Sequence, residues 1–390
     1  MTVRLAVLGL GRGAVLTVPA LAADSRITLV AGCDPNARAR EGFGLRAFAS
    51  AEELFAWGAF DAVYIASPHE YHARHAMMAA AAGKHVLVEK PMAVTLAEAA
   101  DMVRAAEAAG TLLMVGPSHG YDAPVALAAG LVASGEAGPV RLLHGFNFTD
   151  FLYRPRRPAE LDTAQGGGVI LSQATHQIDM VRRIAASPVT SVRAWTGGWD
   201  ARASEGAFTA LLTFASGAAA NLTYSGYARY DSDALAGWAS ELGGLKTPTA
   251  HGRARAALAA ADEQQAKAAR TFAAGRTRPA APLRHERFGS LVALCEKADL
   301  ELTPLGVRLH GDDGVCDVAA PLPPVQRADV ADALVRAVEG MAAPLFDGRW
   351  GFDSLAVCHA ILQSAREGRD VAPATLSDLS STNLSTERSA

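Results

Sequence analysis

Residues 3–34 read VRLAVLGLGRGAVLTVPALAADSRITLVAGCD, and this stretch decides the fold. An apolar run over residues 3–8 leads into the glycine-rich turn GLGRGA, and a second apolar run ends at Asp34. Glycines let the backbone turn tightly into a helix, whose first N–H groups and positive dipole end suit a pyrophosphate. An acidic side chain at the second strand end accepts hydrogen bonds from ribose hydroxyls. The stretch therefore predicts a dinucleotide site formed by Gly9, Gly11, Arg12, Gly13, Ala14 and Asp34.

Asp34 also bears on which dinucleotide binds. Its carboxylate would repel the 2′-phosphate of NADP, so we expect NAD as the cofactor. Arg38 and Arg40 follow closely and leave NADP open as an alternative. We interpret these two arginines first as solvated helix residues.

The pattern of the quoted stretch continues over the first 120 residues, where strand and helix patterns alternate. Such alternation predicts a doubly wound parallel sheet with helices on both faces, a Rossmann domain over residues 1–120. The expected strands are 3–8, 27–32, 62–66, 85–88 and 112–115. The expected helices are 14–23, 51–57, 71–82 and 95–109.

A different texture begins near Gly138 and predicts a second, α+β domain over residues 121–374 with an open, mostly antiparallel sheet. Longer strand patterns cover 140–149, 189–197, 208–215 and 218–225, with one helix at about 169–184. An Ala-rich helical insertion is expected over about 235–283, before strand patterns resume near Phe288. Two closing helices are expected at 325–341 and 352–366, followed by a Ser/Thr-rich, disordered tail over 375–390.

Composition narrows the class of protein. The chain has 390 residues, of which 50% are hydrophobic and 19% charged, with a net charge of −4. Ample apolar surface excludes disorder for most of the chain, and the acidic balance argues against a nucleic-acid partner. No signal peptide is evident, and no apolar run reaches the roughly 20 residues that cross a bilayer. Four scattered cysteines without a CxxC motif favour reduced thiols, so we expect a cytoplasmic protein without a membrane partner.

A second motif, Glu89-Lys90-Pro91, lies at the end of an expected buried strand. The carboxyl ends of parallel strands form the ligand crevice, where a lysine can bind a substrate oxygen or exchange a proton. A cis bond before Pro91 is one possibility that the sequence leaves open. Taken alone, a lysine at this position is more often a surface residue than a functional one.

A third motif begins with three glycines, Gly166 to Gly168, which open a helix bearing Ser172, His176 and Asp179. Spacings of four and three residues place these side chains on one helix face. His176 is a candidate general base, because imidazole titrates near working pH. A structural histidine remains the alternative.

Histidines recur at positions 69, 72 and 75, a spacing that could suggest a metal site. Steps of three drift around a helix, and no set of carboxylates or cysteines accompanies them. We therefore expect no metal, and we expect His72 to pack near the cofactor.

The order of these motifs resembles the glucose–fructose oxidoreductase, inositol dehydrogenase and MocA (Gfo/Idh/MocA) family over nearly the whole chain. The residues that carry the resemblance are the glycine turn, Asp34, Ser67-Pro68 with His72, Glu89-Lys90-Pro91, and the helix with His176 and Asp179. The resemblance implies NAD(P)-dependent hydride transfer, with Lys90 and His176 catalytic. It also implies Ser67, Pro68, His72, Glu89, Lys90 and Pro91 at the cofactor, and a homodimer or homotetramer.

Two departures from the family pattern concern the substrate. The family helix reads Asp-x-x-x-His, but Ser172 stands at the Asp position, and residues 116–121 (GPSHGY) lack the commoner arginine. Many family members use that Asp against polyol hydroxyls. Its absence makes a sugar or inositol substrate the less favoured alternative.

A closer resemblance is to the branch that oxidises phthalate 4,5-cis-dihydrodiol to a dihydroxy aromatic acid. It is carried by YRPRRP (153–158), LDTAQGGG (161–168), and Ser172-Gln173 followed by His176-Gln177. Guanidinium groups suit the substrate carboxylates, although a solvated loop or subunit salt bridges would explain the arginines equally well. The expected substrate-binding residues are His119, Arg154, Arg156, Arg157, Ser172, His176, Asp179 and Arg183.

The sequence thus predicts an NAD-dependent dehydrogenase acting on a small carboxylated cis-diol. Either His176 or Lys90 takes the hydroxyl proton as hydride leaves, and the other steadies the developing alkoxide. Two alternatives stay open: a sugar or inositol dehydrogenase of the same fold, and a non-catalytic NAD-binding regulator.

Overall fold

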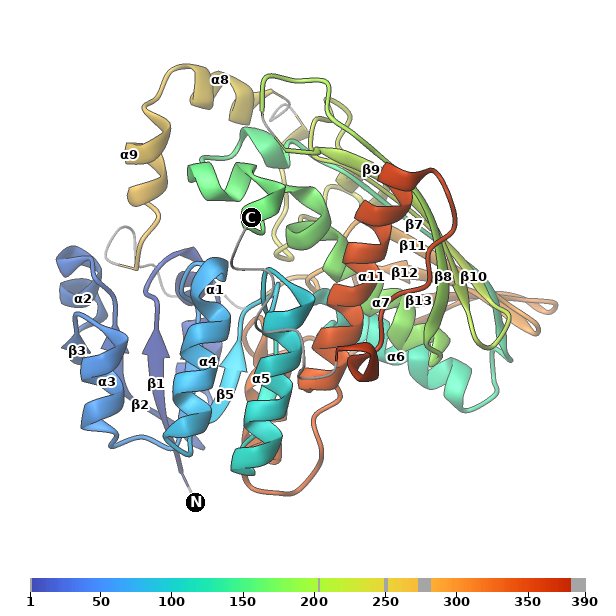
Figure 1. The fold of residues 1–390 in the computed structure, drawn as a ribbon. Coiled ribbons are helices and arrows are strands. Elements are labelled where there is room, and N and C mark those ends of the chain that lie inside the picture. The colour runs from blue at the N-terminus through green and yellow to red at the C-terminus, as the bar shows by residue number, and fades with distance from the viewer. Residues whose placement is uncertain (1, 203, 249–251, 273–281, 380–390) are drawn as a thin grey trace.

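The computed structural model describes residues 2–202, 204–248, 252–272 and 282–379. Two β-sheets lie beside each other, and helices pack between and around them (Figure 1). The buried apolar residues of one face of the first sheet and of the inner face of the second form one continuous cluster. The two sheets therefore share a core.

The first sheet is parallel, as the sequence predicted, with the order β3-β2-β1-β4-β5-β6. Its strands are β1 Val3–Leu8, β2 Ile27–Cys33, β3 Arg46–Phe48, β4 Ala62–Ile65, β5 His85–Val88 and β6 Leu113–Val115. The edge strand β3 was not predicted, and neither was the short helix α2, Ala37–Phe43. Three residues with an exposed arginine carry too little apolar pattern to reveal an edge strand.

Helices cover both faces of this sheet, because alternate strand residues point to opposite sides. On one face α1 (Arg12–Ala23), α2 and α10 (Ala328–Val338) pack against Leu5 and Val7. On the other face α3 (Ala51–Trp57), α4 (His72–Ala81) and α5 (Leu96–Ala109) pack against Ala6 and Leu8. The chain thus returns from the second sheet to complete the first domain with α10.

The second sheet is mostly antiparallel, with the order β14-β13-β12-β11-β7-β10-β9-β8, and only β7 and β10 run parallel. Its strands are β7 Val140–Phe148, β8 Val189–Gly197, β9 Ala207–Phe214, β10 Ala219–Ser225, β11 Ser290–Cys295, β12 Ala298–Thr303, β13 Gly306–Gly311 and β14 Gly314–Ala319. The open α+β architecture is confirmed.

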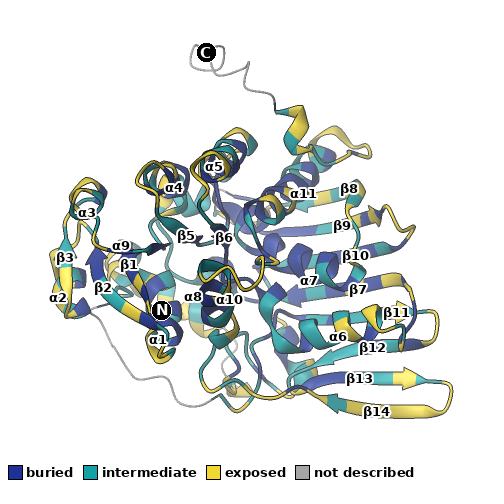
Figure 2. Cartoon of the chain, turned by 90° about the horizontal axis from the view of Figure 1, so that it is seen from below, coloured by how far each residue is buried: buried dark blue, intermediate teal, exposed yellow. Residues whose placement is uncertain are grey.

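Helices cover only one face of the second sheet, as Figure 2 shows. They are α6 (Ala123–Ala133), α7 (Thr175–Ala185) and α11 (Gly348–Glu367). The strand registers place Leu142, Leu211, Leu294 and Trp195 on the other face, where all four are exposed. Among the described residues, no helix covers these four apolar side chains, which share the outer face with polar residues such as Asn221 and Arg193.

Helix α11 contacts both domains, packing against α5 and β6 on one side and against β8 and α7 on the other. Gly351 lies so close to β6 that an added Cβ would clash with the side chain of Val115. The helix begins where the Asp347 carboxylate accepts a hydrogen bond from the N–H of Trp350, at 2.8 Å. Because α11 packs against both domains, the Asp347 cap at its start stabilises the packing of both.

The helix expected at about 169–184 is confirmed, with a π-helical turn, Ile170–Ala174, leading directly into α7. The expected helical insertion needs correction. The insertion at 235–283 is helical only in α8 (Arg253–Ala259) and α9 (Glu263–Ala268), because alanine propensity alone does not hold a helix without an apolar face to bury. Part of the insertion lies outside the described residues.

The expected tail begins with an ordered 3₁₀ turn, Leu376–Asp378, and the carbonyl of Leu379 accepts a hydrogen bond from Arg104. Residues 380–390, the rest of the expected tail, lie outside the described residues. Across the described ranges, no helix is long and apolar enough to cross a membrane.

Replacing the cap residue, Asp347→Ala, should lower the free energy of unfolding by about 1 kcal/mol, because the N–H of Trp350 loses its acceptor. Urea denaturation followed by circular dichroism measures the change. Asp313→Ala, in the exposed turn between β13 and β14, is the matched control and should leave the midpoint unchanged. Equal midpoints for both variants would contradict the role of the cap.

Candidate active site

The glycine-rich turn lies between β1 and α1, at the carboxyl edge of the first sheet. Gly9 has a φ of +94°, and an added Cβ there would clash with the backbone of Ser67, so only glycine allows this close approach. Gly11 precedes α1 without a side-chain cap, and an added Cβ would meet open space. Free N–H groups at the start of α1 therefore face a space that a phosphate group can enter.

Asp34 follows β2 and shapes the same turn. Its carboxylate accepts hydrogen bonds from the backbone N–H groups of Leu10 and Asn36, both at 2.8 Å. Arg40 donates to the backbone carbonyls of Asp34 and Pro35, whereas Arg38 is exposed. The carboxylate thus stands beside the glycine turn, and Arg40 is engaged by the backbone.

His72 connects the loop after β4 with the loop after β5, and both loops belong to the predicted cofactor site. Its ring nitrogens lie 2.8 Å from the carbonyl oxygens of Ser67 and Pro91, deep in the protein. Pro68 follows Ser67, and the Lys90–Pro91 peptide bond is cis. His72 therefore ties the loop after β4 to the loop after β5, beneath the surface that a cofactor would contact.

Glu89 ends β5 beside the glycine turn. Its carboxylate accepts a hydrogen bond from Tyr64 at 2.6 Å and lies within 3.3 Å of where a Cβ on Gly13 would be. The side chain of Ala14, one residue further, is buried in the core. The small residues of GLGRGA thus let α1 begin against the ends of β4 and β5.

Lys90 reaches from β5 into the second domain. Its Nζ donates a 2.7 Å hydrogen bond to the carbonyl oxygen of Ser172, in the π turn before α7. Burial lowers the pKa of Lys90 below its usual value. The Ser172 hydroxyl donates to the carbonyl of Gly168, so this residue contributes its backbone to the site, whereas the sequence predicted its side chain.

His176 lies on α7, one turn beyond that contact. Its Nδ1 accepts a hydrogen bond from the backbone N–H of His119 at 3.3 Å, and its ring packs against the rings of His119 and Phe288. Burial, together with the nearby charges of Lys90 and His119, holds the pKa of His176 well below its usual value. The neutral ring therefore carries its proton on Nε2, where it can donate to a substrate oxygen.

His119 has the opposite electrostatic setting. Its Nδ1 lies 2.7 Å from Asp122, and its Nε2 lies 3.8 Å from Glu241. Burial alone would lower the pKa of His119, but the two carboxylates outweigh it and raise the pKa to about 10. His119 is thus a buried imidazolium beside a neutral His176.

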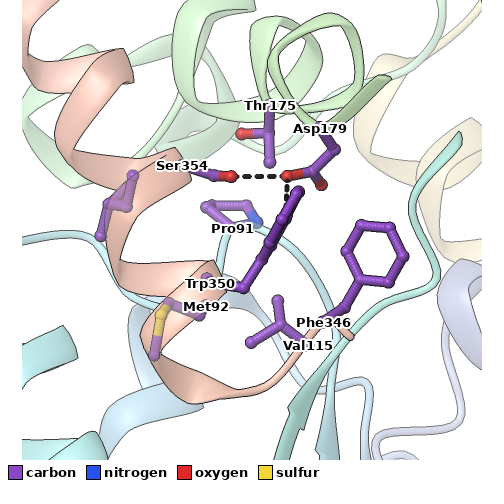
Figure 3. A pocket seen from close by; sticks show the side chains of 10 residues that line it. Pro91, Met92, Val115, Thr175, Asp179, Phe346, Trp350 and Ser354 are labelled. Atoms are coloured by element: carbon purple, nitrogen blue, oxygen red, sulfur yellow. Dashed lines mark hydrogen bonds between the residues drawn. The ribbon is translucent and has the colours of Figure 1, made fainter. Parts of the chain in front are cut away.

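Asp179 lines a small internal cavity beside Ser354 and Trp350 (Figure 3). Its carboxylate accepts hydrogen bonds from Ser118 and Ser354 at 2.5 Å and from the Trp350 indole at 2.8 Å. The adjoining cavity measures about 10 Å³, room for one water molecule. Asp179 therefore holds the loop bearing His119 against α7 and α11.

The four predicted substrate-binding arginines do not all meet. Arg154 lies 3.6 Å from Glu241 and enters the group around His119. Arg156 is buried over the Phe151 ring, and its Nε has no hydrogen-bond partner in the described part of the chain. Arg157 pairs with Glu70 at 2.7 Å, and Arg183 donates to the carbonyl of Gly120.

Glu241 was not predicted from the sequence, because it lies in the insertion without a recognisable motif. Arg327, which precedes α10, was also missed; it donates to Thr17 at 2.6 Å and lies 3.4 Å from Glu286. Of the residues that the sequence analysis missed here, Asp122 alone could have been found from the sequence, because it stands three residues after His119. No group of metal-ligating side chains is found among the described residues.

Comparison with known proteins gives the fold a family. The model of the oxidoreductase family with an NAD-binding Rossmann fold matches residues 3–117, and the GFO/IDH/MocA C-terminal domain matches residues 125–240. The chain belongs to the Gfo/Idh/MocA family. It is therefore an NAD-binding oxidoreductase, and the resemblance seen in the sequence is confirmed.

Individual relatives extend over nearly the whole chain. The 1-carboxy-3-chloro-3,4-dihydroxycyclohexa-1,5-diene dehydrogenase of Comamonas testosteroni is 39% identical over 93% of this chain and 95% of its own. A solved protein from Bordetella bronchiseptica RB50 is 41% identical, with a TM-score of 0.91 over 95% of this chain and all of its own. An Agrobacterium radiobacter oxidoreductase solved with NAD⁺, 20% identical, shares the fold with a TM-score of 0.72 over 95% of this chain and 98% of its own.

The residues of the cleft fit the dinucleotide of this family. The open space at Gly11 and the free start of α1 suit a pyrophosphate, and the Asp34 carboxylate suits a ribose diol. Arg12 stands at the start of α1, where burial lowers its pKa and the nearby charges of Arg270 and Arg327 lower it further. This positive surrounding favours a bound anion.

Replacing the ribose-facing carboxylate, Asp34→Asn, should narrow the preference for NAD over NADP at least about tenfold, because the charge that repels a 2′-phosphate is removed. Titration calorimetry with both dinucleotides measures the ratio. Asp61→Asn, at the amino edge of the same sheet where Asp61 pairs with Arg4, should leave the ratio unchanged. An unchanged ratio in Asp34→Asn would argue that discrimination lies elsewhere.

Proposed function

We propose that this protein oxidises a carboxylated arene cis-dihydrodiol, such as phthalate 4,5-cis-dihydrodiol, to the corresponding dihydroxy aromatic acid. One observation carries the proposal: Lys90, His176 and Arg154 belong to one group of side chains, linked through His119 and Glu241, in a chain 39% identical to a relative named for a carboxylated ring diol. Oxidation of such a substrate needs a proton-transfer group, and recognition of its carboxylate is suited to a guanidinium.

Lys90 is the better proton acceptor of the two candidates. Its lowered pKa leaves more neutral amine near pH 7 than an exposed lysine has, whereas His176 already carries its proton on Nε2. In this assignment neutral Lys90 takes the hydroxyl proton, and the Nε2–H of His176 donates to the same oxygen as negative charge develops there. When bound, NAD⁺ supplies the hydride acceptor.

The carboxylate partner that fits best is Arg154, with Arg156 behind it. Arg154 faces the group around His119, and the buried Arg156 adds a second positive charge close to it. Arg157 and Arg183 are occupied by Glu70 and Gly120. We therefore narrow the proposed carboxylate contacts to two of the four arginines.

We propose further that copies of the chain form a homodimer or homotetramer through the outer face of the second sheet. Leu142, Leu211, Leu294 and Trp195 are all exposed on that face, and exposed apolar side chains gathered on one face suit an interaction site. A cytoplasmic location remains a prediction, in keeping with four free cysteines.

The first experiment is a turnover panel followed by NADH absorbance. The cis-4,5-dihydrodiol of phthalate, an uncarboxylated arene cis-dihydrodiol and myo-inositol are each offered with NAD⁺ and with NADP⁺. We expect turnover of the carboxylated diol with NAD⁺, since the site offers both guanidinium and proton-transfer groups. Turnover of inositol alone would replace the proposal with polyol chemistry, and silence across the panel with intact NAD binding would overturn it.

The assignment of the base predicts a pH profile. A base must be neutral to act, so kcat/KM should rise with pH through the Lys90 pKa, which lies below its usual 10.5, and then level off. Lys90→Ala and His176→Asn should each reduce kcat about 100-fold or more while leaving NAD affinity nearly unchanged.

The two variants separate the roles. His176→Asn should keep the rise with pH, because Lys90 remains, whereas Lys90→Ala should lose it. A rise that disappears in His176→Asn but persists in Lys90→Ala would reverse the assignment. Near-normal turnover in both variants would rule out both residues as catalytic groups.

A further inference from the structure

Glu241 lies on a tight turn of the insertion, far in sequence from the residues it joins. The turn is closed by hydrogen bonds between Ser240 and Gly244, at 2.7 Å, and between Gly243 and Ser240, at 2.9 Å. The carbonyl of Glu241 itself accepts a bond from the N–H of Arg287 at 3.1 Å. The backbone of Glu241 is therefore held on both sides.

A buried ionic group anchors this turn to the second sheet. Arg287 bonds to Asp233 at 2.9 Å, to the carbonyl of Ala239 at 3.2 Å and to that of Gly289 at 2.7 Å. Lys246 pairs with Asp233 at 2.6 Å and with Asp231 at 2.7 Å. Buried charges of this kind are stable only when fully paired, so the turn has little freedom to move.

The Glu241 side chain points toward the catalytic groups. Its oxygens lie 3.8 Å from His119 Nε2 and 3.6 Å from Arg154 Nη1, both longer than a direct hydrogen bond. The charges of His119 and Arg154 overcome the effect of burial and lower the pKa of Glu241, so the group is ionised. With 33% of its side chain exposed, the carboxylate keeps lone pairs that a ligand can reach.

Ser172 leaves the site without a carboxylate on the π turn, and its hydroxyl is occupied by Gly168. We propose that Glu241 is the carboxylate that binds the diol, by accepting a hydrogen bond from the hydroxyl next to the reacting one. The reacting hydroxyl has a single proton, which goes to Lys90, and a carboxylate at the neighbouring hydroxyl holds the diol in place. This inference rests on the proposed function, and it assigns the diol contact to a different element of the fold.

The negative charge of Glu241 also orients the ring of the substrate. A substrate carboxylate is repelled by Glu241 and attracted by the positive charges of Arg154 and Arg156, so the substrate binds with its hydroxyls toward Glu241. His119 and Arg154 neutralise Glu241 and thereby allow a negative group beside the reacting oxygen. Glu241 is in this account a specificity-determining residue for the diol, and Lys90 remains the base.

A binding experiment tests the inference without turnover. Titration calorimetry is run on the NAD⁺-loaded protein with 3,4-dihydroxybenzoate and with benzoate, which differ only in the vicinal hydroxyls. We expect wild type to bind the dihydroxy acid about tenfold more tightly, and Glu241→Gln to lose most of that preference. Benzoate affinity should stay the same or improve, since a repelling charge is removed.

Two further variants complete the design. Glu241→Asp keeps the charge on a shorter arm and should recover part of the preference. Glu296→Gln removes a surface carboxylate that pairs with Arg141 and should behave as wild type. NAD affinity should be equal in all variants, which shows that the fold is intact.

The outcomes separate this inference from the proposed function. Equal loss of both ligands in Glu241→Gln, an unchanged preference, or no hydroxyl-dependent binding by wild type would each overturn the role of Glu241. Tighter binding of both acids in Glu241→Gln would also overturn it, because Glu241 would then only compete for Arg154. A silent turnover panel with hydroxyl-dependent binding intact would reject the proposed substrate and leave the diol contact standing.

Discussion

The hydrogen bond from Lys90 Nζ to the carbonyl of Ser172 is the constraint on which the site depends. It joins the end of a strand in the first sheet to the π turn before α7 in the second domain. A buried amine is costly unless it finds an acceptor, so the bond fixes how closely the two domains approach. The carboxyl edge of the first sheet and the π turn before α7 are consequently in contact.

Burial then sorts the titratable groups of that cleft into distinct states. Lys90 and His176 lie where burial lowers their pKa values, and the charged forms of both are disfavoured. His119 is equally buried, but Asp122 and Glu241 keep it positively charged. Adjacent groups with opposite protonation preferences are what a proton-transfer site requires. The arrangement follows from which side chains have a carboxylate within reach.

The family fold leaves substrate choice to side chains outside its shared motifs. The relatives of about 20% identity share the fold alone, and the NAD-binding Rossmann model covers residues 3–117 of the first domain. The loop of residues 153–158 and the insertion both belong to the second domain. They supply Arg154 and Glu241, respectively. Function on this scaffold is therefore argued from the site and not from the fold.

The sequence by itself determined the parallel sheet, the dinucleotide turn with Asp34 and the positions of Lys90 and His176, because each rests on local spacing and periodicity. It missed β3, the π turn and the irregular course of the insertion, where tertiary contacts override local propensity. Only the tertiary structure decided that Ser172 contributes its carbonyl, that Asp179 accepts a hydrogen bond from Ser354, and that Glu241 lies near Arg154. Contacts between residues so distant in sequence carry no periodic signal, since they arise from packing of the two domains.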